Sequence, residues 1–271
     1  MKSCKVIAYD LRHGLGRKQY LALPLLFLIP CILWIELMRD AGVPGKLGDC
    51  LAFIWMGRGP IQPGENPVEL PYFLMLTVIG SLYFNLDYLL NDLTRFGQQI
   101  IFRIGSRRCW YLSKCIWNMA ACGLYMLTGI LCAVISTVLA GGTMTWQITP
   151  EMLLFFAGFP PEDMTIMQCL CLYLLSPYLA VWAFNMIQMT LCLFVKPIVS
   201  FLCSLTLVVL TIFWYSPYFF GNGAMVVRSG FLGEQGLSPV ALGLSALAVI
   251  VAAVIVGCWR FEKMDILSME K

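Results

Sequence analysis

The sequence predicts an all-α polytopic membrane protein, with one transmembrane domain over residues 1–271, and two observations lead to this fold class. Hydrophobic residues make up 60% of the 271 residues and charged residues only 12%, whereas a soluble domain has about 25% charged residues. Several apolar runs are also close to the roughly 20 helical residues that cross a bilayer core about 30 Å thick. We therefore expect a bundle of membrane-spanning helices.

Residues 1–20 form an amphipathic segment ahead of the first apolar run. Its apolar residues recur at three- and four-residue steps: Cys4, Ile7, Ala8, Leu11 and Leu15. Its basic residues are Lys2, Lys5, Arg12, Arg17 and Lys18. This pattern predicts a helix in the membrane interface, where anionic lipids attract basic side chains. An unstructured basic leader that only sets the topology is the alternative.

Six apolar runs follow as predicted membrane spans. We expect them at about 21–37, 71–90, 116–140, 167–194, 197–215 and 240–259. Pro177 should break or bend the fourth span, because proline removes a helical hydrogen bond. Residues 216–238 are too apolar for a free loop and too rich in glycine for a span, so they predict short broken helices before the sixth span. The sequence leaves open whether 152–158 and 219–233 re-enter the membrane.

The distribution of Lys and Arg predicts the orientation of these spans. With six spans, 14 of the 18 basic residues lie on the side that holds both termini, segment 91–114 and Lys196. The other side holds only Arg39, Lys46, Arg58 and Arg228. Cytoplasmic loops carry an excess of Lys and Arg, so both termini and segment 91–114 are predicted to be cytoplasmic.

No catalytic motif is recognisable in the sequence. His13 is the only histidine, so the H-E-x-x-H motif of zinc proteases is absent, and so are the G-x-S-x-G motif and the G-x-x-x-x-G-K-[ST] phosphate loop. The twelve cysteines fall mostly inside apolar runs and form no C-x-x-C pair, which predicts reduced, buried side chains rather than disulfides or metal ligands. We expect no enzyme activity, cofactor, metal or nucleic-acid partner on this chain.

Segment 91–114, NDLTRFGQQIIFRIGSRRCWYLSK, is the clearest functional candidate. It is a basic interruption between two apolar runs, with five basic residues and one acid, Asp92. Leu93, Phe96, Ile100 and Ile104 recur at three- and four-residue steps, which places them on one face of a helix. The segment could therefore be a cytoplasmic helix that contacts a partner, or a plain interfacial anchor without one.

Several sequence patches carry a family resemblance. They include GRGPIQPGENPVELPYF, the acid Asp87 near the end of the second span, a Gly-Gln-Gln element at 97–99 and an Arg-x-x-Ser-Arg-x-x-Trp element at 103–110. GNGAMVVRS and WRFEKMDI follow further on. In these patches the chain resembles the membrane subunit of bacterial ATP-binding-cassette exporters of the type-2 permease family. More narrowly, it resembles exporters of amphipathic peptides such as phenol-soluble modulins and lantibiotics.

The resemblance implies two copies of this subunit in the bacterial cytoplasmic membrane, each docked on a separate ATPase that holds ATP and Mg. The ATPase contacts would lie in the coupling segment, on Arg95, Phe96, Gln98, Gln99, Ile100, Arg103, Ile104 and Arg107. Arg107, Arg108 and Lys114 would anchor the segment at lipid headgroups. The substrate path would be lined from the second and fifth spans by Tyr83, Phe84, Phe213 and Trp214.

The predicted substrate is an amphipathic peptide or a lipid, because the expected lining is apolar and aromatic with few charges. Two other functions stay open from the sequence. One is an ATPase-coupled protein that senses or sheds antimicrobial peptides without transporting them, and the other is an autonomous secondary transporter or channel. A neighbouring reading frame for a P-loop ATPase would separate the ATPase-coupled functions from the autonomous transporter.

Overall fold

The computed structural model describes residues 2–60, 70–97, 100–102, 105–152, 164–233 and 236–264, without the side chains of 2–4, 95 and 96. These residues form helices and connecting turns, with two isolated β-bridges. Five helical stretches are long and apolar enough to cross a membrane: Lys18–Ala41, Tyr72–Asp92, Arg107–Leu139, Ile166–Leu191 and Pro239–Lys263. The predicted fold class, an all-helical membrane protein, is thus supported by length and composition, while Pro197–Phe213 is a shorter apolar helix.

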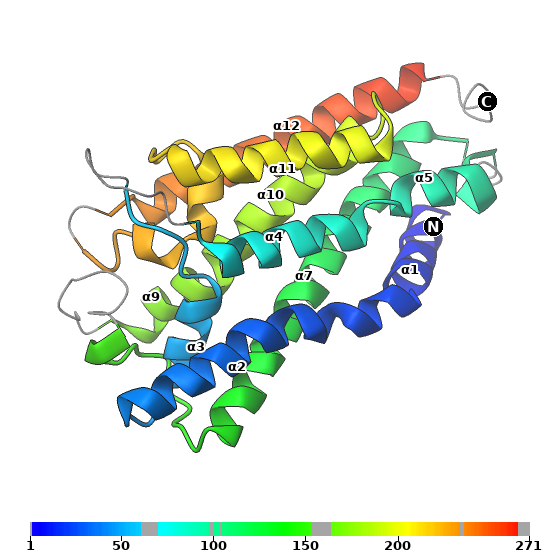
Figure 1. Cartoon of the computed structure of the whole chain (residues 1–271). Helices are drawn as coiled ribbons and strands as arrows, with labels where there is room; N and C mark the ends of the chain where they lie inside the picture. The colour runs from blue at the N-terminus through cyan, green and yellow to red at the C-terminus, as the bar shows by residue number, and fades with distance from the viewer. Residues whose placement is uncertain are drawn as a thin grey trace.

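The long helices run side by side along one axis (Figure 1). The α-helices are α1 (Lys2–Leu15), α2 (Leu23–Ala41), α3 (Leu47–Ile54), α4 (Tyr72–Asn85), α5 (Tyr88–Asp92), α7 (Arg107–Leu139), α9 (Ile166–Leu170), α10 (Ser176–Leu191), α11 (Pro197–Phe213) and α12 (Pro239–Lys263). The 3-10 helices are η1 (Lys18–Ala22), η4 (Phe220–Ala224) and η5 (Val226–Arg228). The π-helical turns are η2 (Leu93–Gly97) and η3 (Cys171–Leu175).

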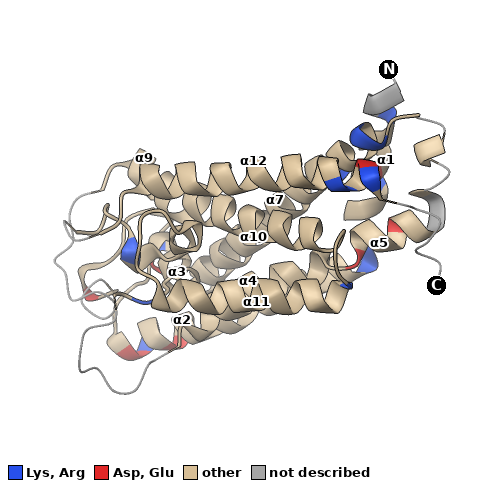
Figure 2. Ribbon diagram, turned by 90° about the horizontal axis from the view of Figure 1, so that it is seen from above, with Lys and Arg blue, Asp and Glu red and all other residues tan. Residues whose placement is uncertain are grey.

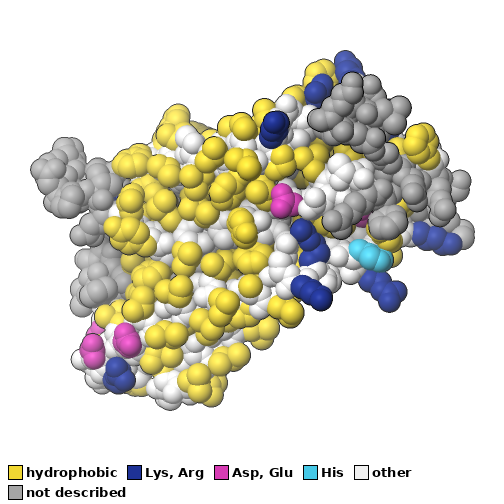
Figure 3. Space-filling view, turned by 45° about the vertical axis from the view of Figure 1, so that its right-hand side comes forward, with side chains coloured by type: hydrophobic (Ala, Val, Ile, Leu, Met, Phe, Trp, Pro, Cys, Tyr) yellow, Lys and Arg dark blue, Asp and Glu magenta, His cyan; other side chains and the backbone are white. Residues whose placement is uncertain are grey.

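The two ends of the bundle differ in what they hold. Helix α1 lies across one end, beside α5, and the opposite end holds α3 with η4 (Figure 1). These are called the α5 end and the α3 end below. Charged residues gather at both ends, and the middle of the bundle has almost none (Figure 2). Hydrophobic side chains cover much of the surface between the ends (Figure 3), as expected for helices that face lipid.

Three features of the helices add detail to the predicted spans. The helix that holds the third predicted span begins at Arg107, because Ser106 caps its first turn by accepting a hydrogen bond from the Cys109 N–H (3.4 Å). The second span is interrupted at residues 86–87, between α4 and α5. The irregular part of the fourth span is η3, one turn before Pro177, since a proline leaves the carbonyl four residues earlier without its helical donor.

Helix α3 lies inside the bundle. Its sequence is too short to span a membrane, and all eight of its residues are buried, in contact with α2, α4 and α7. Its first turn is held by Asp49, whose carboxylate accepts hydrogen bonds from the Lys46 N–H (2.8 Å) and the Thr149 N–H (2.7 Å). Protein contacts therefore surround this short helix, because lipid could not hydrogen-bond with the polar backbone groups at its two ends.

Neutral polar residues join the helices in the interior. The Tyr20 hydroxyl donates to Asn85 (2.9 Å), the Asn85 amide donates to Asn185 (2.9 Å), and the Asn185 amide donates to Ser81 (3.0 Å). Gln188 donates to the Leu82 carbonyl (2.9 Å). Such bonds stabilise helix packing where lipid offers no partner. The eleven cysteines whose side chains the structure describes are free, as predicted, but only seven of them are buried.

Candidate functional site at the α5 end

Lys114 lies between two carboxylates at the α5 end. Its Nζ atom is 2.5 Å from Asp10 Oδ1 and 2.6 Å from Asp92 Oδ2. The side chains of Lys114 and Asp10 are 0% exposed and that of Asp92 is 10% exposed. Because α1 supplies Asp10, α5 supplies Asp92 and α7 supplies Lys114, one buried cation joins three elements that are far apart in the sequence.

Hydroxyl groups and aromatic rings complete this cluster. Ser113 and Tyr88 both donate hydrogen bonds to the Asp10 carboxylate, the latter over 3.2 Å. The Lys114 ammonium lies 4.9 Å from the ring centre of Tyr88 and 4.8 Å from that of Trp110, within the range of cation–π attraction. A buried ion pair needs this kind of additional hydrogen bonding to offset its desolvation. Asp10, Ser113, Lys114, Tyr88 and Asp92 are called the ion cluster below.

The ion cluster corrects one prediction. Lys114 was expected at lipid headgroups, but it is fully buried because two acids of the chain itself surround it. The face of α1 that packs against the bundle consists of Val6, Asp10 and Gly14 at four-residue spacing. A Cβ atom on Gly14 would collide with the Trp117 side chain, so glycine is needed where α1 approaches α7. The predicted stripe is half-buried or exposed in the part that the structure describes.

Two arginines attach the end of α12 to the start of α7. The Arg107 guanidinium donates to the carbonyl oxygens of Glu262 (3.0 Å) and Met264 (2.7 Å), which lie among the carbonyls that have no partner inside the helix. Arg108 pairs with the Glu262 carboxylate through both oxygens. This second pair is exposed, so we expect it to contribute little to stability.

The structure covers only part of the predicted ATPase contact. Arg95 and Phe96 lie in η2, with side chains outside the described atoms, and residues 98, 99, 103 and 104 lie outside the described residues altogether. Ile100 is half-buried, and Arg107 is bonded to α12 as above. Phe102, which the sequence interpretation missed because it falls off the three- and four-residue pattern, has 81% of its surface exposed.

The predicted path residues form two separate pairs. Tyr83 and Phe84 end α4 towards α5, whereas Phe213 and Trp214 follow α11 towards η4, at the opposite end of the bundle (Figure 1). Helices α4 and α11 do contact each other. Tyr83 is 65% and Trp214 58% exposed, so these aromatic side chains lie on the surface of this chain and enclose no path within it.

A second buried cation, Arg228, stabilises the α3 end. It is 1% exposed and donates to the carbonyls of Arg58 (2.6 Å), Thr211 (2.7 Å), Ile212 (2.6 Å) and Gly59 (3.4 Å), and to the Asn222 side-chain oxygen. Thr211 and Ile212 are in the last turn of α11, so Arg228 caps that helix. Burial lowers the pKa of Arg228 from its ordinary value to about 10. The sequence indicated this site only as a lone arginine in an apolar, glycine-rich segment.

In comparisons with known proteins, no family model, no curated protein and no solved structure matches the chain. Within the described ranges, no group of three or more His, Cys, Asp or Glu side chains could hold a metal ion. Function is therefore inferred from the geometry of the ion cluster and its surroundings.

Proposed function

We propose that this chain is the transmembrane subunit of an ATP-driven exporter, which works with a second copy of itself and a separate ATPase. One observation carries the proposal: the start of the coupling segment, at Asp92, is tied through Lys114 to both α1 and α7. A partner that moves this segment would therefore move the N-terminal helix and the longest helix of the bundle with it.

The energy of the ion cluster makes it suitable for such transmission. Removing one partner of a buried ion pair costs about 3–5 kcal/mol, because it leaves an uncompensated charge. A displacement of Asp92 is therefore resisted at Lys114, and through it at Asp10. ATP and Mg would be held by the partner ATPase, and the binding energy of ATP would select between two positions of the segment.

The contact with the ATPase would use the predicted residues of the coupling segment together with Phe102. An aromatic side chain that is exposed next to basic residues is typical of a protein interface. The predicted set comprises Arg95, Phe96, Gln98, Gln99, Ile100, Arg103, Ile104 and Arg107. In this proposal Arg107 acts indirectly, since it is hydrogen-bonded to the end of α12.

The substrate path would run between two copies of the chain. Tyr83, Phe213 and Trp214 are exposed on α4 and at the end of α11, and these helices pack beside each other. A path lined by such aromatic side chains suits an amphipathic peptide or a lipid. The proposed location is the bacterial cytoplasmic membrane with both termini in the cytoplasm, which the Lys and Arg distribution favours.

Co-purification with the P-loop ATPase of a neighbouring reading frame tests the proposal. We expect a stable complex, with ATP-dependent accumulation of a fluorescent amphipathic peptide or lipid in inverted vesicles. In the Lys114→Met variant, the ATPase should still hydrolyse ATP, but the fluorescent peptide or lipid should no longer accumulate in the vesicles. The reason is that the coupling segment is no longer tied to α1 and α7. Arg108→Met is the matched control, since its exposed pair with Glu262 should matter little.

Three outcomes would contradict this proposal. If no ATPase binds, the chain does not belong to such an exporter. If the complex hydrolyses ATP in response to peptide without accumulating it, the sensing function replaces export. If accumulation follows an ion gradient without ATP, the chain is an autonomous transporter. A Phe96→Asp, Arg103→Glu double variant that still binds and couples would show that the assigned contact face is wrong.

A further inference from the structure

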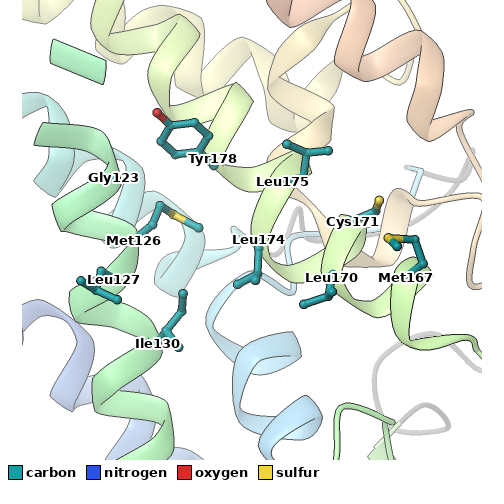
Figure 4. Close-up of a pocket in the computed structure, with 10 residues that line it drawn as sticks. All are labelled: Gly123, Met126, Leu127, Ile130, Met167, Leu170, Cys171, Leu174, Leu175 and Tyr178. Carbon is teal, nitrogen blue, oxygen red and sulfur yellow. The ribbon is translucent and has the colours of Figure 1, made fainter. Parts of the chain in front are cut away.

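An apolar groove of about 490 Å³ lies between α7 and the stretch from α9 to α10 (Figure 4). Its lining residues are Gly123, Met126, Leu127, Ile130, Met167, Leu170, Cys171, Leu174, Leu175 and Tyr178. Figure 4 shows side chains of the two walls facing each other across the groove. None of them belongs to the ion cluster or to the predicted substrate path, so the groove is a separate feature of the molecule.

The lining offers almost no hydrogen-bonding capacity. Tyr178 has the only hydroxyl group among the lining side chains, and it already donates to the Met119 carbonyl (3.1 Å). The Cys171 thiol is a weak donor. A peptide or a sugar in this groove would leave its own polar groups unsatisfied, so the chemistry selects a ligand without polar atoms.

Gly123 indicates that this groove is kept open for an occupant. Glycine inside a helix is destabilising relative to alanine, so a helical glycine normally has a packing reason. Gly129, two turns further along α7, has one, since a Cβ atom there would lie 2.7 Å from the Phe27 ring. At Gly123 an added Cβ would meet no atom within 4 Å. No neighbour in the described structure requires this glycine, but a side chain at 123 would fill the groove.

The opposite wall has an unusual backbone. Cys171, Leu174 and Leu175 line the groove from η3, a π-helical turn. Such turns are rare, and Pro177 accounts for this one because it leaves a carbonyl of η3 without its helical donor. Next to this wall, the Tyr178 hydrogen bond holds α10 to α7. The groove is thus bounded by the hydrogen bond between Tyr178 and Met119 and by the π-helical turn η3 next to it.

We propose that this groove binds one hydrocarbon chain of a membrane lipid. It opens on a surface whose exposed residues are apolar on both sides, with Leu131 and Ile135 on α7 and Ile166 on α9, and in a bilayer such a surface meets acyl chains. Its volume lies within the roughly 300–1,000 Å³ of ligand pockets. The proposal does not depend on the exporter function.

The dimensions of the groove suit an acyl chain. Residues 123–130 span about 10 Å along the axis of α7. A single file of methylene groups is narrow, and it can follow the groove between the two walls.

Photolabelling of the full chain in nanodiscs tests the proposal. The probe is phosphatidylcholine with a diazirine in the middle of one acyl chain, and labelled residues are located by mass spectrometry. We expect stronger labelling at Met126 and Cys171 than at Ile135. The labelling should fall in Gly123→Ala and fall to the level of Ile135 in Gly123→Leu. Both variants should melt at or above the temperature of the wild type, since position 123 has room and glycine is the less stable residue inside a helix.

Ile135→Phe is the matched control, because it enlarges an exposed residue of α7 outside the groove and should leave the groove labelling unchanged. Equal labelling of Met126, Cys171 and Ile135 in the wild type would overturn the proposal. Unchanged labelling in a folded Gly123→Leu would also overturn it. A photoreactive amino acid at Leu127 that links to a second copy instead of to lipid would show that a protein surface covers the groove.

Discussion

The two buried cations of this protein are held in opposite ways. Lys114 at the α5 end is held by carboxylates from α1 and α5. Arg228 at the α3 end is held by four main-chain carbonyls and one amide oxygen, and no acid of the described chain pairs with it. The first site depends on two particular side chains, whereas the second depends mostly on the path of the backbone.

This difference bears on which end can move. An ion pair between separate elements can be broken and remade as the elements shift, provided that something offsets the cost of the unpaired charge. A carbonyl cage is lost only if the backbone of α11 and of residues 58–59 is rearranged. We infer that the α5 end is where a partner could act on the bundle, and that the α3 end is a fixed support.

The largest effect should come from Lys114→Met, which leaves two carboxylates without their cation. We expect a loss of about 3–5 kcal/mol in the free energy of unfolding, measured by reversible denaturation in detergent micelles. Arg108→Met removes a cation of the same end from an exposed pair, and should cost less than about 1 kcal/mol. Similar costs for both variants would mean that Lys114 is not the centre of the cluster.

A smaller effect is expected for Arg228→Lys at the other end. The lysine keeps the charge but offers three donors in place of five and lacks the planar fork of arginine. Carbonyls in the last turn of α11 would lose their partner, at a cost of about 1.5–3 kcal/mol. Hydrogen exchange should show faster opening at the end of α11 while α5 is unaffected. Faster exchange at both ends would contradict the separation of the two supports.

Asp92→Asn should have a smaller effect again. Its amide oxygen can still accept a hydrogen bond from Lys114, and Asp10 still balances the charge, so we expect a loss of about 1 kcal/mol. The matched control is Asp87→Asn, which changes an exposed acid at the break between α4 and α5 and should change the free energy of unfolding by less than about 0.5 kcal/mol. A larger loss for Asp87→Asn would mean that the break itself, and not the cluster, positions α5.

The local parts of the fold could be predicted from the sequence. Apolar runs of about 20 residues gave the long helices, and Pro177 marked the irregular fourth helix because its chemical defect acts within one turn. The helix α7 begins at Arg107, nine residues before the predicted third span, and Arg107 and Arg108 gave no hydropathy signal for this first part. Hydropathy ends a span at the first charge, whereas the helix itself continues to its capping residue.

The candidate site could be predicted only in part, for a physical reason. Residues 10, 92 and 114 meet only after three helices have packed, so nothing within any one segment indicates that their charges are paired. Phe102 shows the same limit, because whether an aromatic side chain faces a neighbour or solvent depends on the packing. The predicted path residues lie on α4 and α11, which do pack together, but periodicity could not show that the two pairs lie at opposite ends.

The smallest expected effect concerns the pH dependence of the Arg228 site. Burial lowers the Arg228 pKa from its ordinary value to about 10, so the folded and unfolded chains differ in protons bound at this residue only above about pH 9. Above about pH 9 the unfolded chain binds more protons at Arg228 than the folded chain does, so the free energy of unfolding rises with pH. Below that pH, Arg228 contributes no pH dependence to the free energy of unfolding. The carbonyl acceptors do not titrate either. The cost of Arg228→Met, measured by denaturation, should therefore be constant from about pH 6 to pH 9. A cost that falls on acidification would show that an acid, and not the carbonyl cage, holds this arginine.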